Sequence, residues 1–394
     1  MVHSSDVLDR RAYLKGAGAA GAVALAGCAA TPGSGGGEDS GSYSVGIVHF
    51  GLDSPLAAVM GQAAEWYAEG TEGIEVTVRD GQRDPSKQLE DANFFLQQGV
   101  DAMAMAPFDS DALAKPVEEA AADDIPTMAV NIGVNTEEAL GYNAVGQASG
   151  GQRTAERMVE ALEERYGEPR GRVGILTQVL QYNNVIQRTE GFQQVMDQYD
   201  DIEVIQTLQV DPSTQAQAQQ TAVNFLQANP DIDGMYYVWG AGGAGLMSAL
   251  QRVDMWNENG NDDHVIVTGV DGSPRLLDAV NDGFIDYIAD QPVHWEYPLA
   301  LKIIQDYLDA GNDESAITQP GDTVETDYLT VPDQTIDHPD LGELPVWQEP
   351  TWGPSEVTTF SEEYPYPYIQ EQWTDVTAEN ATSAIHWENI SEGM

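Results

Sequence analysis

A glycine-rich turn is the first stretch of this sequence whose residue types and spacing could do chemistry. In "YYVWGAGGAG" a strand-like run precedes Gly240, Gly242 and Gly245, which have the G-x-G-x-x-G spacing of a dinucleotide-binding turn. Such a turn needs an acidic residue about 20 positions later to hold the cofactor's ribose. His264 stands near that position and Asp271 lies well beyond it, so the sequence predicts no nucleotide and no other cofactor.

The usual hydrolytic patterns are also missing from the sequence. There is no G-x-S-x-G and no H-E-x-x-H, and the six histidines lack the spacing of metal ligands. Acidic pairs occur throughout, so a glycosidase-like couple of carboxylates stays open as an alternative, which would make the protein a surface carbohydrate-active enzyme. The sequence otherwise predicts that the protein is not an enzyme, with no catalytic residue and no metal site.

The charge of the chain excludes several classes of partner. There are 65 acidic residues against 16 basic residues, a formal net charge of -49. Nucleic acids and anionic lipid surfaces are bound by clustered Lys and Arg, which this chain lacks. Because 42% of the residues are hydrophobic, the acidity does not indicate a disordered chain. We expect a halophilic surface, adapted to concentrated salt that screens the repulsion.

The N-terminal segment reads as an export signal rather than as part of the fold. The twin arginine Arg10 and Arg11 precedes an apolar stretch that is too short to span a membrane. "RRAYLK" resembles a twin-arginine (Tat) signal and "LAGC" resembles a lipobox. We therefore expect a signal over 1–27, lipid attachment at Cys28 and a flexible lipoprotein linker over 28–42. The protein would be exported and lipid-anchored on the outer side of the cytoplasmic membrane.

From Tyr43 onward, short apolar runs alternate with amphipathic stretches. This alternation predicts an α/β fold with two doubly wound, parallel-sheet (Rossmann-like) lobes. We expect the lobes to be joined by a hinge of three crossings near residues 146, 290 and 322, with a ligand cleft between them. The predicted parts are an N-terminal lobe of 43–146 plus 291–322, a C-terminal lobe of 147–290, and an acidic Pro- and aromatic-rich tail of 323–394 wrapping a lobe.

Several segments in this order carry a family resemblance. They are "DGQRDPSKQLEDANFFLQQGVDAMAMAPFDSDAL", "IPTMAVN", "RTEGFQQVM", "VTGVDGSPRLLDAVNDG" and "YIADQP". The region from about residue 43 to 322 resembles the substrate-binding proteins of sugar ABC importers, in the ribose-binding-like branch of the type I periplasmic binding proteins. The resemblance implies a monomer that captures a pentose or hexose by hinge closure and delivers it to the permease and ATPase subunits of an importer.

The resemblance also implies which residues of the first lobe face the ligand. In "HFGLDSP", Phe50, Asp53 and Ser54 correspond to the first ligand-facing turn, although Phe50 could equally be a core residue at a strand end. Asn131 stands where ribose binders carry an Asp-Arg pair, and Ile132 follows it. This departure keeps a receptor for a nucleoside or a signalling molecule open as an alternative.

In the second lobe, the resemblance points to a basic and an acidic residue. Arg188 in "QRTEGF" matches the family's ligand arginine, and a guanidinium fork can donate two parallel hydrogen bonds to neighbouring hydroxyls. Its alternative role is a salt bridge on an acidic surface. Asp271 in "TGVDGSP" matches a ligand-contacting carboxylate, which accepts charge-assisted hydrogen bonds from a sugar, and its alternative role is a helix cap.

The remaining candidates are less specific. Asp290 and Gln291 match the last crossover between the lobes, and the sequence leaves open which of them points inward. Tyr182 lies on a loop before the Arg188 helix, and Trp239 could be either a sugar platform or a core anchor. The glycines after Trp239 replace a polar pair of the family, which suggests room beside a ligand and weakens the case for ribose itself.

Overall fold

The computed structural model describes residues 41–180, 183–383 and 385–394. The predicted export signal, Cys28, the linker up to residue 40 and Tyr182 lie outside the described residues. Residues Gly41–Met394 form one unit, which contains two lobes that are each built on their own sheet. Within this part of the chain, no helix combines the length and the apolar composition that crossing a bilayer requires.

The first lobe is built on an eight-stranded sheet with the order β11-β14-β15-β5-β4-β3-β1-β2. Five of these strands come from the alternating pattern and run parallel to their neighbours. They are β1 (Tyr43–His49), β2 (Ile74–Asp80), β3 (Ala102–Met105), β4 (Thr127–Val130) and β5 (Gly141–Val145).

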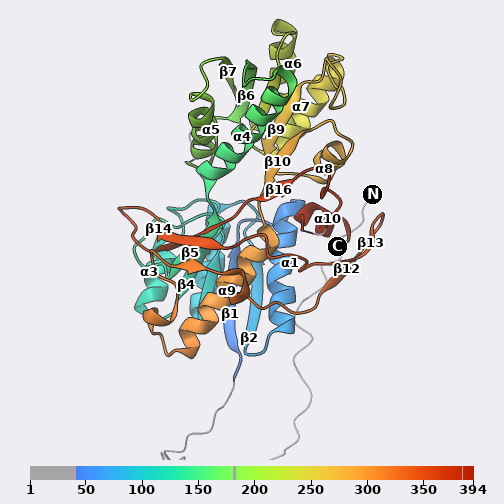
Figure 1. The fold of residues 1–394 in the computed structure, drawn as a ribbon. Coiled ribbons are helices and arrows are strands. Elements are labelled where there is room, and N and C mark those ends of the chain that lie inside the picture. The colour runs from blue at the N-terminus through green and yellow to red at the C-terminus, as the bar shows by residue number, and fades with distance from the viewer. Residues whose placement is uncertain (1–40, 181–182, 384) are drawn as a thin grey trace, which may run out of the picture. The chain divides into compact units, whose positions relative to one another are not determined.

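Helices cover both faces of this sheet (Figure 1). Successive side chains of a strand point to opposite faces, so Val45 and Ile47 enter the core on one face and Val48 enters the core on the other. The first face packs against α1 (Pro55–Gly70) and α9 (Val293–Asp309), and the second against α2 (Pro85–Gln98) and α3 (Ala114–Ala122).

The second lobe contains a six-stranded sheet with the order β16-β10-β9-β8-β6-β7. Its first five strands along the chain are parallel, and only β16 is antiparallel. The two sheets and their helices confirm the predicted α/β class. The elements are α4 (Gln147–Tyr166), β6 (Gly171–Gln178), α5 (Asn183–Met196), β7 (Ile202–Val210), α6 (Gln215–Ala228), β8 (Gly234–Tyr237), α7 (Gly240–Arg252), β9 (Ile266–Val270), α8 (Pro274–Asn281) and β10 (Tyr287–Asp290).

The tail differs from the expected extended segment over one lobe, because it adds strands to both sheets. β15 pairs in parallel with β5, and Tyr368 and Ile369 enter opposite cores as in any buried strand. Pro367 is tolerated because it stands at the first residue of β15. The elements after α9 are η1 (Glu314–Ala316), β11 (Thr323–Val324), η2 (Thr326–Tyr328), β12 (Thr335–His338), β13 (Gly342–Pro345), β14 (Ser355–Thr359), β15 (Pro367–Glu371), β16 (Thr374–Val376) and α10 (Trp387–Glu392).

The third crossing between the lobes lies elsewhere than predicted. The first two occur at Gly146, between β5 and α4, and at residues 291–292, between β10 and α9, as expected. The third is at Gln372 and Trp373, where the chain passes from β15 in the first sheet to β16 in the second, rather than near residue 322. The reason is that Thr323 and Val324 remain in the first sheet, paired with β14.

Candidate ligand-binding site

Arg188 is the centre of the polar side chains that the sequence predicted for the second lobe. It lies on α5 and is only 4% exposed. Its Nη1 donates to Asp271 Oδ2 at 2.8 Å and to the Val238 carbonyl at 3.3 Å, and its Nε donates to Gln147 Oε1 at 2.7 Å. A buried guanidinium with three acceptors is held in one orientation, so Arg188 and Asp271 are fixed relative to each other.

A chain of hydrogen bonds extends from Asp271 into the first lobe. Gln291 Nε2 donates to Asp271 Oδ1 at 2.7 Å, and Asn131 Nδ2 donates to Gln291 Oε1 at 3.2 Å and to Glu296 Oε1 at 3.0 Å. Four predicted residues, Arg188, Asp271, Gln291 and Asn131, are therefore continuous in space. We call this set the polar network.

Backbone geometry at two strand ends helps to form the polar network. Asn131 follows β4 with φ of 63°, and Asp271 follows β9 with φ of 66°. Asn and Asp adopt this left-handed conformation more readily than other residues with side chains. Tyr142 also donates from its hydroxyl to the Asn131 carbonyl at 2.9 Å. Both side chains are thus positioned by turns at the carboxyl ends of parallel strands, where ligands of such sheets bind.

Trp373 of the tail belongs to the same neighbourhood and was missed by sequence reasoning. The Arg188 Cζ lies 5.2 Å from the centre of the Trp373 ring, a cation–π arrangement. The indole N–H donates to the Gly146 carbonyl at 2.8 Å, which joins the third crossing to the first. The only signal in the sequence was an aromatic residue in "YIQEQW", more than 180 positions after Arg188.

Two buried carboxyl groups adjoin the polar network in the first lobe, one of them bonded to Asn131, and the sequence did not predict them. Glu296 of α9 and Glu371 of β15 are 0% and 2% exposed, and we call them the buried carboxyl pair. Asn143 donates to Glu371 Oε1 at 2.7 Å and to the Glu296 carbonyl at 2.9 Å. Among the described residues, Oε2 of each carboxyl has no hydrogen-bond partner. Burial raises the pKa of Glu371 to about 8, and burial together with Glu371 raises that of Glu296 well above its usual range.

The loop that was predicted to face the ligand in the first lobe forms a separate group around Arg83. The Arg83 Nε donates to Asp53 Oδ1 at 2.7 Å, its Nη2 donates to Ser54 Oγ at 3.2 Å, and its Cζ lies 5.6 Å from the Phe50 ring centre. Ser54 also caps α1 by accepting from the Ala57 N–H. Phe50 is 8% exposed and packs in the core. Arg83, in the quoted "DGQRDPSK", is the residue that sequence reasoning missed here.

Asp290 and Trp239 lie outside the polar network. Asp290 Oδ1 accepts from the Gly272 N–H and from the Trp387 indole N–H, both at 3.1 Å, so it faces the C-terminal helix. Of the pair that the sequence left open, Gln291 joins the polar network. Trp239 is buried in the second lobe's core, and its indole N–H has no partner among the described residues.

The glycine run has a structural reason that differs from the expected room beside a ligand. A Cβ on Gly242 would lie 2.5 Å from the Trp239 ring, and one on Gly243 would lie 2.7 Å from the Tyr237 ring. A Cβ on Gly240 would lie 2.7 Å from the Gly272 carbonyl oxygen. The glycines thus allow the first turn of α7 to pack directly on the lobe's own aromatic rings.

A family model described as a periplasmic binding protein domain matches residues 45–313, more than half of the chain. The chain belongs to this family. It is 24% identical over 278 residues to the ribose import binding protein RbsB of Bacillus subtilis, covering 71% of this chain and 86% of that protein.

Solved structures of other binding proteins share the fold of this periplasmic binding protein. A periplasmic ribose ABC transporter structure from Conexibacter woesei has a TM-score of 0.61 at 22% identity and covers 70% of this chain and 89% of its own. AraP, an arabinose binding protein from Geobacillus stearothermophilus, has a TM-score of 0.64 at 17% identity. The match covers 86% of this chain and 98% of AraP. The structural match to AraP covers more of this chain than the family model, which matches residues 45–313.

Family membership decides between two of the alternatives that the sequence left open. Proteins of this family bind solutes for transport and do not catalyse reactions, so the chain is a solute-binding protein rather than a carbohydrate-active enzyme.

Proposed function

We propose that this protein captures a small sugar, a pentose or hexose, and delivers it to the permease and ATPase subunits of an ABC importer. The observation that carries the proposal is the polar network, which brings a guanidinium, a carboxylate and two amides together from both lobes. Vicinal hydroxyls pair well with such groups, because carboxylate oxygens accept and the guanidinium fork donates. The relatives named for ribose and arabinose support a sugar over a nucleoside.

Binding would exchange partners within the polar network. Arg188, Asp271, Gln291 and Asn131 now satisfy one another, and sugar hydroxyls would replace these mutual hydrogen bonds. Gln291 lies in the crossing between β10 and α9, so its partners change as the lobes close. A sugar that bonds to both lobes at once stabilises the closed form. The protein would act as a monomer, without a cofactor.

A carbohydrate panel tests this proposal. In molar salt, one pentose or hexose is expected to change the Trp fluorescence saturably, because Trp373 lies against Arg188. At about 100 times its dissociation constant, that sugar should stabilise the fold by about 2.7 kcal/mol, seen as a higher melting temperature. Nucleosides are the comparison ligands. A panel in which no sugar shifts either signal, or in which only nucleosides do, would overturn the sugar assignment.

We further propose that the protein is a Tat-exported, lipid-anchored lipoprotein of a halophile. The support is the twin arginine, the "LAGC" sequence at Cys28 and the net charge of -49. The anchor would be its only membrane contact, since the acidic body repels anionic lipid.

Cys28→Ala should release the protein from the membrane fraction. Each lipid CH₂ that enters the bilayer contributes about 0.8 kcal/mol, and the variant has no thiol to carry the chain. Cell fractionation followed by mass measurement of the N-terminal peptide checks this. Ser40→Ala in the linker serves as the control and should stay with the membrane. Retention of the Cys28→Ala protein on membranes would count against the anchor.

A further inference from the structure

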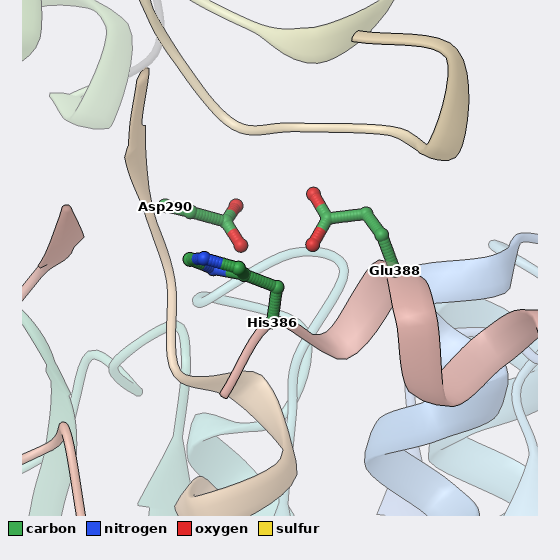
Figure 2. Close-up of side chains that lie close together, drawn as sticks. All are labelled: Asp290, His386 and Glu388. Carbon is green, nitrogen blue, oxygen red and sulfur yellow. The ribbon is translucent and has the colours of Figure 1, made fainter. Parts of the chain in front are cut away.

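A second cluster of chemically capable side chains lies at the C-terminal helix, outside the polar network. Asp290 comes from β10, His386 directly precedes α10, and Glu388 lies in its first turn. Figure 2 shows the three side chains pointing toward one another from these two elements. One ligand atom of each lies within 4.8 Å of the others, and all three residues are at most 1% exposed.

The cluster leaves several buried polar atoms without a partner. Among the described residues, both oxygens of Glu388, Oδ2 of Asp290 and Nδ1 of His386 make no hydrogen bond. No Lys or Arg of the described chain forms an ion pair with either carboxylate. Two buried carboxylates with no cation are costly, by several kcal/mol for each ion. The arrangement therefore requires a positive charge or a shared proton.

Surrounding contacts orient the imidazole in the manner of a metal ligand. His386 Nε2 lies 3.3 Å from Asn380 Oδ1, and that same oxygen accepts from the Thr377 N–H at 2.8 Å. Because Asn380 Oδ1 is an acceptor, Nε2 carries the proton, and Nδ1, which has no partner among the described residues, keeps its lone pair. Metal-binding histidines typically donate their second ring N–H to such an oxygen. Asp290 Oδ1 is similarly fixed by Gly272 and Trp387.

We propose that Asp290, His386 and Glu388 bind a Zn²⁺ ion. Zn²⁺ binds His nitrogen and Asp or Glu oxygen, usually four such atoms in a structural site, and the cluster offers four atoms without another partner among the described residues: His386 Nδ1, Asp290 Oδ2 and both oxygens of Glu388. The two carboxylates balance the charge of the ion. Ca²⁺ and Mg²⁺ are less suited, since they require six or more oxygen ligands. The role is structural, because the ion joins α10, which packs on α1 of the first lobe, to the strand that leads into the crossing at Gln291.

Metal analysis of the full chain tests the site. Protein purified without chelator, or incubated with Zn²⁺ and dialysed, should hold about one Zn²⁺ per chain. A chelator should remove the ion and lower the melting temperature, and added Zn²⁺ should restore it. These measurements are made in molar salt with excess Mg²⁺, because the acidic surface attracts divalent ions in general.

Matched variants locate the ion. Glu388→Gln and His386→Gln should reduce the Zn²⁺ content at least tenfold, whereas Glu392→Gln, on the same helix but with a side chain 43% exposed, should keep it. If the first two variants do not fold, the chelation and restoration of the unaltered chain decide the matter. The site is overturned if the chain binds no Zn²⁺ under these conditions, or if neither chelator nor Zn²⁺ changes its melting temperature. In that case Asp290 and Glu388 share a proton.

Discussion

Arg188→Ala should weaken sugar binding by about 100-fold, the equivalent of about 2.8 kcal/mol. Truncating one partner of a buried, hydrogen-bonded charge pair costs about 2–5 kcal/mol, partly because the other charge stays buried without it. Here the substitution removes the donor to Asp271 Oδ2 and the cation that faces Trp373. Equilibrium titration of the best sugar from the panel, followed by Trp fluorescence, measures the loss.

The conservative variant separates a binding role from a structural one. Arg188→Lys keeps the charge but loses the fork, so it should bind more weakly than the unaltered protein and more tightly than Arg188→Ala. Asp271→Ala should lose a similar amount of affinity. Each titration is done below the variant's melting temperature. If Arg188→Ala and Asp271→Ala lower the melting temperature but leave the dissociation constant unchanged, these residues hold the lobe together and do not bind ligand.

The strands of the two lobes were predictable because their signal is local. Each of β1, β3, β8 and β9 is a short apolar run with a helix after it, and parallel strands buried on both faces have that composition. Asn131 and Asp271 follow parallel strands of two different sheets, at the carboxyl ends where ligands of such sheets bind, and the family resemblance singled them out. Gln291 was placed by resemblance in the last crossover.

The tail could not be predicted in the same way, because its partners are remote in sequence. β15 pairs with β5 across more than 200 residues, and nothing within "YPYPYIQEQW" states which edge it will meet. The same pairing brings Glu371 to Asn143. Glu296 gave no signal either, because it is an acid in the first turn of a helix, where acids are common. The buried carboxyl pair was therefore not predictable from the sequence.

The sequence could not show which of the adjacent residues Asp290 and Gln291 faces the polar network. Adjacent residues in extended chain point to opposite sides, so only one of the two could face the polar network. The choice depends on Trp387 and Gly272, which bind Asp290 from the other side. Trp387 belongs to the tail, whose position was the missing information.

Glu371→Gln should stabilise the protein increasingly as the pH rises from about 5 to 8. The folded pKa of Glu371, about 8, lies above the ordinary value of 4.5 because the group is buried. A raised pKa means that the fold prefers the protonated form. The stability that depends on this proton is complete below the unfolded pKa and is lost as the pH rises through the folded one, by up to about 1.4 kcal/mol for each pH unit.

The glutamine imitates the protonated acid and does not titrate. Its side-chain oxygen can still accept from Asn143, whose Nδ2 lies 2.7 Å from Glu371 Oε1. The variant should match the unaltered protein near pH 4.5 and exceed it by several kcal/mol near pH 8, in urea unfolding at constant salt. Glu379→Gln, an exposed acid of the same tail, corrects for the loss of one charge from a very acidic chain. A difference between Glu371→Gln and the unaltered protein that stays constant across this range would mean that Glu371 is ionised in the fold, in which case Glu296 alone would hold the proton of the buried carboxyl pair.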